Sequence, residues 1–284
     1  MRTLALLFAP AAGSHCTPPP WATVGELAAR NLPVPDTALQ GMQRVYHYYI
    51  PTSYGDNTQF PVVLDFHGYY DNAVTQSTED MVAALAERDG FIAVYPQGFN
   101  DSPERKKWLG AWSGPGLNGS QGRYGRICHP EHDPYVCYES CRIKGVCKPG
   151  HRHVDDCHCG PCVDDDLFME MVITDLTESF CVDQDRVHAT GMSDGGVFLW
   201  GLAGRDFGRH LASIVLVAAS PVLGHLNPPS HPMPVLDIHG TVDHCVPSNA
   251  TNSYGRFRGA CPVKELGPYG CGVGDDYWYY ETTA

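Results

Sequence analysis

The residues best suited to chemistry form the pentapeptide Gly191-Met192-Ser193-Asp194-Gly195, which matches the pattern G-x-S-x-G. A free serine hydroxyl is a weak nucleophile, so it must sit on an exposed turn beside a base. Flanking glycines allow a strained strand-to-helix turn without clashes of a Cβ atom. A run of β type precedes the pentapeptide and a helix-compatible run follows it. This context favours Ser193 as a nucleophile over an ordinary glycine-rich turn.

The candidate acidic partner is Asp243, which follows the segment His239-Gly240. Two expected strands, residues 213–219 and 235–238, separate Asp243 from Ser193. Hydrolases of the α/β type place their triad in the chain order Ser, Asp or Glu, then His, at the C-terminal ends of strands. Asp243 fits that order and would orient and stabilise the protonated base. The alternative is a solvated loop aspartate.

Two backbone N–H groups are expected to stabilise the oxyanion that forms during acyl transfer. One comes from the residue after the nucleophile, Asp194, and the other from the loop that begins at His67-Gly68. We assign the second donor to the backbone of Tyr69, while Gly68 and Tyr70 stay open as alternatives. A simple loop without such a role is the other interpretation.

The base of a serine triad is the group that the sequence does not supply. The only histidine after Asp243 is His244, and adjacent residues on an extended loop point apart. The upstream residues His225, His231 and His239 are expected to be structural or loop residues. We therefore expect a sequence that is incomplete at its C-terminus, or a relative that has lost the base.

Alternating strands and helices are expected to position these groups. Strands are predicted over residues 62–66, 91–95, 186–190, 213–219 and 235–238, and helices over residues 78–88, 165–180 and 196–204. Ser77 and Asp80 have the spacing of a capping box, and Gly90 ends the first helix. The alternation predicts an α/β class: one domain over residues 15–284, with a mostly parallel, doubly wound sheet.

An irregular insertion over about residues 122–162 interrupts this pattern. Residues 128–162 hold seven of the twelve cysteines. Disulfides are the favoured interpretation, and a structural zinc site around Cys157, Cys159 and Cys162 is the alternative. Because seven is odd, one insertion cysteine pairs outside the segment or stays free, and Cys181 is the candidate partner.

The position of the insertion suggests a role at the substrate site. It lies between the early strands and the helix before Ser193, so we expect it to form part of a lid or rim. Trp108 and Trp112 are the expected stacking surfaces nearby. A plain surface loop is the alternative.

Composition indicates a secreted globular protein. Hydrophobic residues make up 43% of the chain and charged residues 18%, which argues against disorder. Residues 1–14 combine Arg2, a short apolar run and small residues, the pattern of a signal peptide, with a plain apolar N-terminus as the alternative. A net charge of −13, with no Lys/Arg run beyond the three residues Arg105-Lys106-Lys107, disfavours nucleic acid and anionic membranes as partners.

These motifs together resemble the secreted poly(3-hydroxybutyrate) depolymerase and feruloyl esterase group, which is close to carbohydrate esterase family one. The likeness covers residues 46–251, and its segments are residues 62–68, 163–166, 181–183, 186–196 and 239–243. The resemblance implies an α/β-hydrolase fold and an acyl-enzyme on Ser193, with Asp243 as the acid. It implies a small-molecule or polymeric ester as substrate, such as one from plant cell walls.

No cofactor is expected for this chemistry. Cleavage of another bond type, or a secreted binding protein that has lost its base, are the alternatives, because fold does not fix substrate.

Overall fold

A computed structural model describes the parts of the chain that carry the site. These are residues 16–34, 36–55, 58–101, 110–113, 121–122, 125–126, 138–145, 161–219, 229, 231–241 and 243. The predictions for the signal peptide and for Trp108, Cys157, Cys159, His225 and His244 lie outside these residues.

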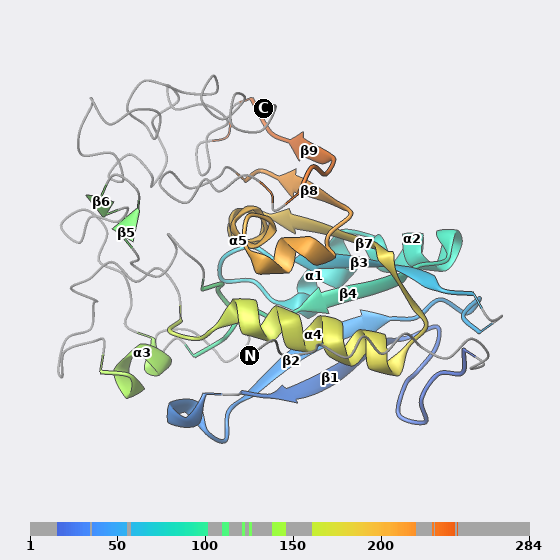
Figure 1. Ribbon diagram of the computed structural model, residues 1–284, viewed down its shortest axis with the longest axis horizontal. Helices are drawn as coiled ribbons and strands as arrows, with labels where there is room; N and C mark the ends of the chain where they lie inside the picture. The colour runs from blue at the N-terminus through green and yellow to red at the C-terminus, as the bar shows by residue number, and fades with distance from the viewer. Residues whose placement is uncertain are drawn as a thin grey trace, which may run out of the picture.

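A mixed seven-stranded sheet organises the described chain (Figure 1). The spatial order is β1-β2-β4-β3-β7-β8-β9. The β1–β2 and β2–β4 pairs are antiparallel, and all later pairs are parallel. The strands are β1 (Leu27–Pro33), β2 (Gln43–Tyr49), β3 (Phe60–Phe66), β4 (Ile92–Pro96), β7 (Val182–Met192), β8 (Ser213–Val217) and β9 (Val235–Ile238).

Central strand β4 is buried along its whole length, and β3 nearly so. Strands that are covered on both faces have continuous apolar sequences rather than alternating ones, and the strand predicted over residues 62–66 has such a sequence. A separate small hairpin joins β5 (Gln121–Gly122) and β6 (Gly125–Arg126) within the insertion.

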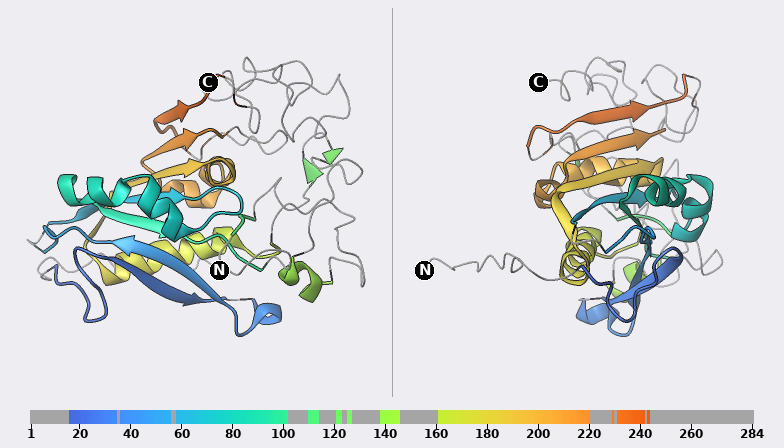
Figure 2. Two further views of the ribbon diagram at one scale, coloured as in Figure 1. Left: turned by 180° about the vertical axis from the view of Figure 1, so that it is seen from behind. Right: turned by 90° about the vertical axis from the view of Figure 1, so that its right-hand side faces the viewer.

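Helices cover both faces of the large sheet. The helices α4 (Asp165–Ser179) and α5 (Asp194–Ala203) lie on one face, and α1 (Ala73–Glu79) and α2 (Val82–Asp89) lie on the other (Figure 2). The short α3 (Glu139–Ile143) belongs to the insertion, and 3₁₀ turns occupy η1 (Thr37–Leu39) and η2 (Asp206–His210). Parallel strands with helices on both faces, and a tight turn from β7 into α5, define the α/β-hydrolase fold.

The helix predicted over residues 78–88 is in fact two helices. Met81 adopts a left-handed backbone conformation (φ 62°), which ends any continuous helix there. The Asp80 carboxylate accepts an N–H at the start of α2 (2.8 Å). Ser77 lies inside α1 and its hydroxyl donates to the Val74 carbonyl (2.8 Å), so the predicted capping box is wrong. Gly90 ends α2 in the left-handed conformation, as predicted.

Two disulfides join described cysteines. Cys16 bonds to Cys181 across a sequence separation of 165 residues, and Cys141 bonds to Cys162 within the insertion. The predicted pairing of Cys181 with an insertion cysteine is therefore wrong, because the N-terminal segment reaches the start of β7 and supplies Cys16. Cys162 is engaged in its disulfide and is not a zinc ligand.

Two other kinds of site are absent from the described residues. Within them, no cluster of three or more His, Cys, Asp or Glu side chains suits a metal ion. No helix in that same part of the chain has the length and apolar character needed to cross a membrane.

Candidate active site

Ser193 forms the turn between β7 and α5 in a strained conformation. Its backbone angles are φ 52° and ψ −121°, a region that residues with a Cβ rarely adopt. The Ser193 N–H donates to the Val217 carbonyl on β8 (2.9 Å), and the Ser193 carbonyl accepts the N–H of Val197 (2.9 Å). These bonds hold a partly exposed serine at the carboxyl edge of the parallel strands. The predicted sequence of strand, turn and helix around Ser193 is confirmed.

The glycines of the pentapeptide are required by close packing. A Cβ on Gly191 would lie 2.7 Å from the carbonyl group of Gly195. A Cβ on Gly195 would lie 2.4 Å from the Phe66 oxygen and 2.5 Å from the His67 oxygen. The obstacles are backbone atoms, so no change of rotamer could relieve either clash. The start of α5 is therefore pressed against the end of β3.

The loop after β3 lies directly against Ser193. A Cβ placed on Gly68 would be 3.5 Å from the Ser193 Cβ. Tyr70 has a φ of 56° and its N–H donates to the Gly110 carbonyl (2.9 Å), while the Asp71 N–H donates to the Gly68 carbonyl (3.2 Å). The loop is thus a tight turn, and the Tyr70 N–H is already engaged and unavailable to an oxyanion.

Among the described residues, the N–H groups of Tyr69 and Asp194 have no hydrogen-bond acceptor. Within the described part of the chain, the Tyr69 N–H donates no hydrogen bond. Asp194 is the first residue of α5, where N–H groups have no acceptor inside the helix. Their joint use as oxyanion donors stays a prediction, and Gly68 stays the alternative to Tyr69.

His67 is held as a neutral imidazole in the protein interior. Its Nε2 accepts the Gly98 N–H (2.9 Å), so Nδ1 carries the proton and donates to the Gly68 carbonyl (2.8 Å). Burial lowers the pKa of His67 to about 4. With both ring nitrogens engaged, His67 fixes the loop and is not available as a base.

Asp243 and Ser193 share the carboxyl edge of the sheet. The parallel register pairs Met192 with Val217, and Val217 with Ile238. Strands lie about 4.8 Å apart, so the chain positions that follow Met192 and Ile238 are separated by about 10 Å. This is the edge at which the chain order predicted the acid.

The Asp243 carboxylate lies beside His239. Asp243 Oδ2 is 3.6 Å from His239 Nε2, and Asp237 Oδ1 is 3.5 Å from His239 Nδ1. The His239 ring is 7% exposed. A carboxylate therefore lies near each ring nitrogen of His239.

Two further described histidines contact other groups. His188 Nδ1 lies 2.8 Å from Ser213 Oγ, and His210 Nε2 lies 3.1 Å from Glu170. Within the described ranges, no histidine ring is hydrogen-bonded to the hydroxyl of Ser193.

Trp112 packs between α5 and the loop that follows β3. It is fully buried, its ring stacks on Phe198 at 4.9 Å, and its indole N–H donates to the His67 carbonyl (2.8 Å). The prediction that Trp112 offers a stacking surface to substrate is therefore wrong. Its backbone N–H donates to Asp194 Oδ2 (3.3 Å), and burial raises the pKa of Asp194 to about 7.

Comparison with known proteins finds no family model and no curated protein that matches the chain. Among solved structures it is similar to a ferulic acid esterase, with 14% identity and a TM-score of 0.41 over 68% of this chain and 60% of that one. It is also similar to a thermostable esterase, with 16% identity and a TM-score of 0.45 over 84% and 52% of the two chains. An acetyl xylan esterase from Aspergillus awamori gives 14% identity and a TM-score of 0.41 over 72% and 57%. The chain spans less than two thirds of the length of each of these proteins.

Proposed function

We propose that the chain is a carboxylic ester hydrolase that works through an acyl-enzyme on Ser193. The observation that carries the proposal is the strained turn at Ser193, with the Gly68 loop against its Cβ. A non-glycine residue in such a conformation costs about 1–3 kcal/mol and persists where the surrounding structure enforces it, often at a site of chemistry.

The proposed reaction has two steps. Ser193 Oγ attacks the ester carbonyl carbon, and the backbone N–H groups of Tyr69 and Asp194 donate hydrogen bonds to the resulting oxyanion. The alcohol leaves with a proton and an acyl ester remains on Ser193, which water then hydrolyses to a carboxylate and free serine. Asp243 is the acid that orients and stabilises the protonated base. We assign the base to none of the described histidines.

We propose a secreted protein with a single domain over residues 15–284 that follows a signal peptide over residues 1–14. The two disulfides support this location, because such bonds persist in oxidising compartments. We also propose, from the sequence resemblance alone, a small or polymeric ester substrate such as one from plant cell walls.

A secreted binding protein that retains the fold is the second candidate. The observation that favours it concerns the two histidines at the carboxyl edge of the sheet. His67 is hydrogen-bonded to backbone groups, and His239 lies between two carboxylates.

Hydrolysis of p-nitrophenyl acetate tests the proposal. Wild type, Ser193→Ala and the exposed control Ser53→Ala are compared with and without added imidazole, which can supply a general base. We expect Ser193→Ala to lower turnover by about 10³-fold or more while Ser53→Ala has no effect. Equal turnover in wild type and Ser193→Ala refutes the acyl-enzyme. Saturable ester binding without turnover in either condition supports the binding protein.

A further inference from the structure

A small apolar cluster joins the insertion to the loop after β3. Ala111, Tyr138 and Cys141 are almost fully buried, and Tyr69 and Cys162 pack against them. The Tyr138 hydroxyl donates to the Tyr69 hydroxyl (3.2 Å). The side chain of the proposed oxyanion donor Tyr69 is therefore held by residues that flank and include the Cys141–Cys162 disulfide.

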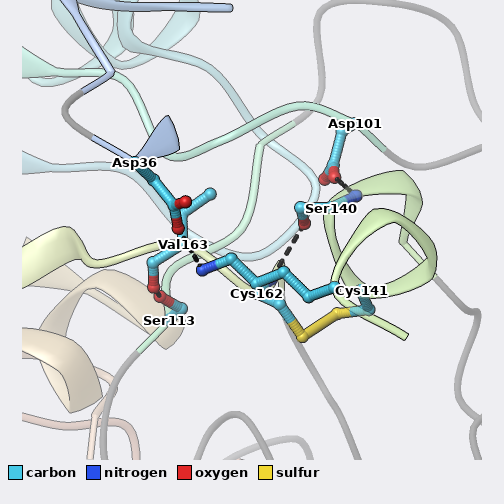
Figure 3. Close-up of a disulfide and its surroundings, with 8 residues drawn as sticks. Asp36, Asp101, Ser113, Ser140, Cys141, Cys162 and Val163 are labelled. Atoms are coloured by element: carbon cyan, nitrogen blue, oxygen red, sulfur yellow. Dashed lines mark hydrogen bonds and ion pairs between the residues drawn. A yellow bond between two sulfur atoms is a disulfide. The ribbon is translucent and has the colours of Figure 1, made fainter. Parts of the chain in front are cut away.

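Hydrogen bonds connect the disulfide to the segment that follows β4 (Figure 3). The Ser140 N–H donates to the Asp101 carboxylate (2.5 Å), and the Cys162 N–H donates to the Ser140 hydroxyl (2.9 Å). Asp101 lies in the segment that follows β4, so a half-buried carboxylate of that segment holds the start of α3. The described part of the insertion thus packs against the loop that follows β3.

Further hydrogen bonds connect the residue after Cys162 to the start of α5. The Ser113 hydroxyl donates to the Val163 carbonyl and the Ser113 N–H donates to Asp165 (2.6 Å). The neighbouring Trp112 N–H donates to Asp194. Cys162, next to Val163, is therefore connected through the chain and these hydrogen bonds to Asp194, and Tyr138 contacts Tyr69, the other proposed oxyanion donor.

We infer that Tyr138, anchored by the Cys141–Cys162 disulfide, is a positioning residue that fixes the Tyr69 backbone N–H for the oxyanion; this rests on the proposed function. The N–H donates to no described group of the protein, so its direction depends on the residues around it. Rotation of one peptide plane would turn the N–H away from the substrate. The hydroxyl contact and the packed Tyr69 ring prevent that rotation.

Steady-state kinetics on p-nitrophenyl esters test this inference. We expect Tyr138→Phe to lower kcat about 3- to 10-fold, and Tyr138→Ala to lower it about 10²-fold, the effect of losing one oxyanion donor. KM should change less than twofold, because the substrate ground state is bound as before. The control Tyr49→Phe removes a surface hydroxyl that bonds to Glu87 and should leave kcat unchanged.

The two disulfides provide a second, matched comparison. Replacing Cys141 and Cys162 together by serine should lower kcat, whereas replacing Cys16 and Cys181 should lower stability and leave kcat unchanged. Hydrogen exchange of residues 67–71 should accelerate in Tyr138→Ala and not in the Cys16 and Cys181 variant. If Tyr138→Ala does not fold, the kcat and the hydrogen exchange of residues 67–71 in Tyr138→Phe test the inference instead.

Two results would overturn the inference while the proposed function stands. One is a kcat of wild-type size in the Tyr138 variants of an enzyme whose turnover depends on Ser193. The other is a rise in KM with kcat unchanged. Absence of Ser193-dependent turnover in wild type overturns the proposed function and this inference together.

Discussion

Replacing Asp194 by Asn is predicted to change how the stability of the protein depends on pH. Burial raises the pKa of Asp194 to about 7, from its usual value of 3.8. Between these two pH values the folded protein keeps a proton that the unfolded chain releases. Stability is therefore greatest below about pH 4 and is lost as pH rises to about 7.

The size of the effect follows from the shift in pKa. The difference between 7 and 3.8 is 3.2 pKa units, and each unit is worth about 1.4 kcal/mol, so the upper limit is about 4 kcal/mol. Asn has nearly the same shape and cannot ionise, so the Asn variant does not lose this free energy. Relative to wild type, its free energy of unfolding should increase by up to about 4 kcal/mol between pH 4 and pH 7.

Urea denaturation followed by tryptophan fluorescence between pH 4 and pH 8 measures this difference. Asp89→Asn serves as the control, because Arg88 lowers the pKa of that exposed carboxyl. A carboxyl whose pKa lies below its usual value of 3.8 changes stability only at more acidic pH, so the stability curve of the control should run nearly parallel to that of wild type over this range. Parallel stability curves for wild type and Asp194→Asn would refute the reasoning.

Three further perturbations follow from the packing, the disulfide and a second buried carboxyl. Gly195→Ala places a Cβ 2.4 Å from a backbone oxygen and should lower the urea midpoint by an amount equivalent to about 3 kcal/mol or more. Gly68→Ala meets only ordinary contacts at 3.5 Å, so an equal loss there would contradict this explanation. Serine at both Cys16 and Cys181 should cost about 3–5 kcal/mol in thermal or urea unfolding, and an unchanged midpoint would show that the bond does not constrain the unfolded chain. Burial raises the pKa of Asp65 to about 9, so Asp65→Asn should be spared the loss of stability that wild type shows as pH rises toward 9, and identical pH profiles would disprove this.

Local patterns in the sequence were enough to predict the central elements. Glycines around Ser193 predicted the tight turn, because only they fit where α5 meets β3. Helical periodicity predicted α4 within one residue, and the bounds of β9 were predicted without error. These features depend on neighbours in sequence.

Features that depend on distant partners were missed. Strand β1 reads Leu-Ala-Ala-Arg-Asn-Leu-Pro and is largely exposed, so only its pairing with β2 defines it. Trp112 is buried because it stacks on Phe198, a residue far along the chain. The Cys16–Cys181 disulfide likewise joins residues 165 positions apart, which no spacing rule could pair.

The central claim is that Ser193 forms a covalent intermediate, and active-site labelling tests it most directly. The protein is incubated with a fluorophosphonate in the presence of imidazole, and the adduct is located by mass spectrometry of peptides. We expect one phosphonyl group on Ser193, with no adduct on the exposed Ser53 and none in Ser193→Ala. An unlabelled wild-type protein, or an adduct on a different residue, would contradict it.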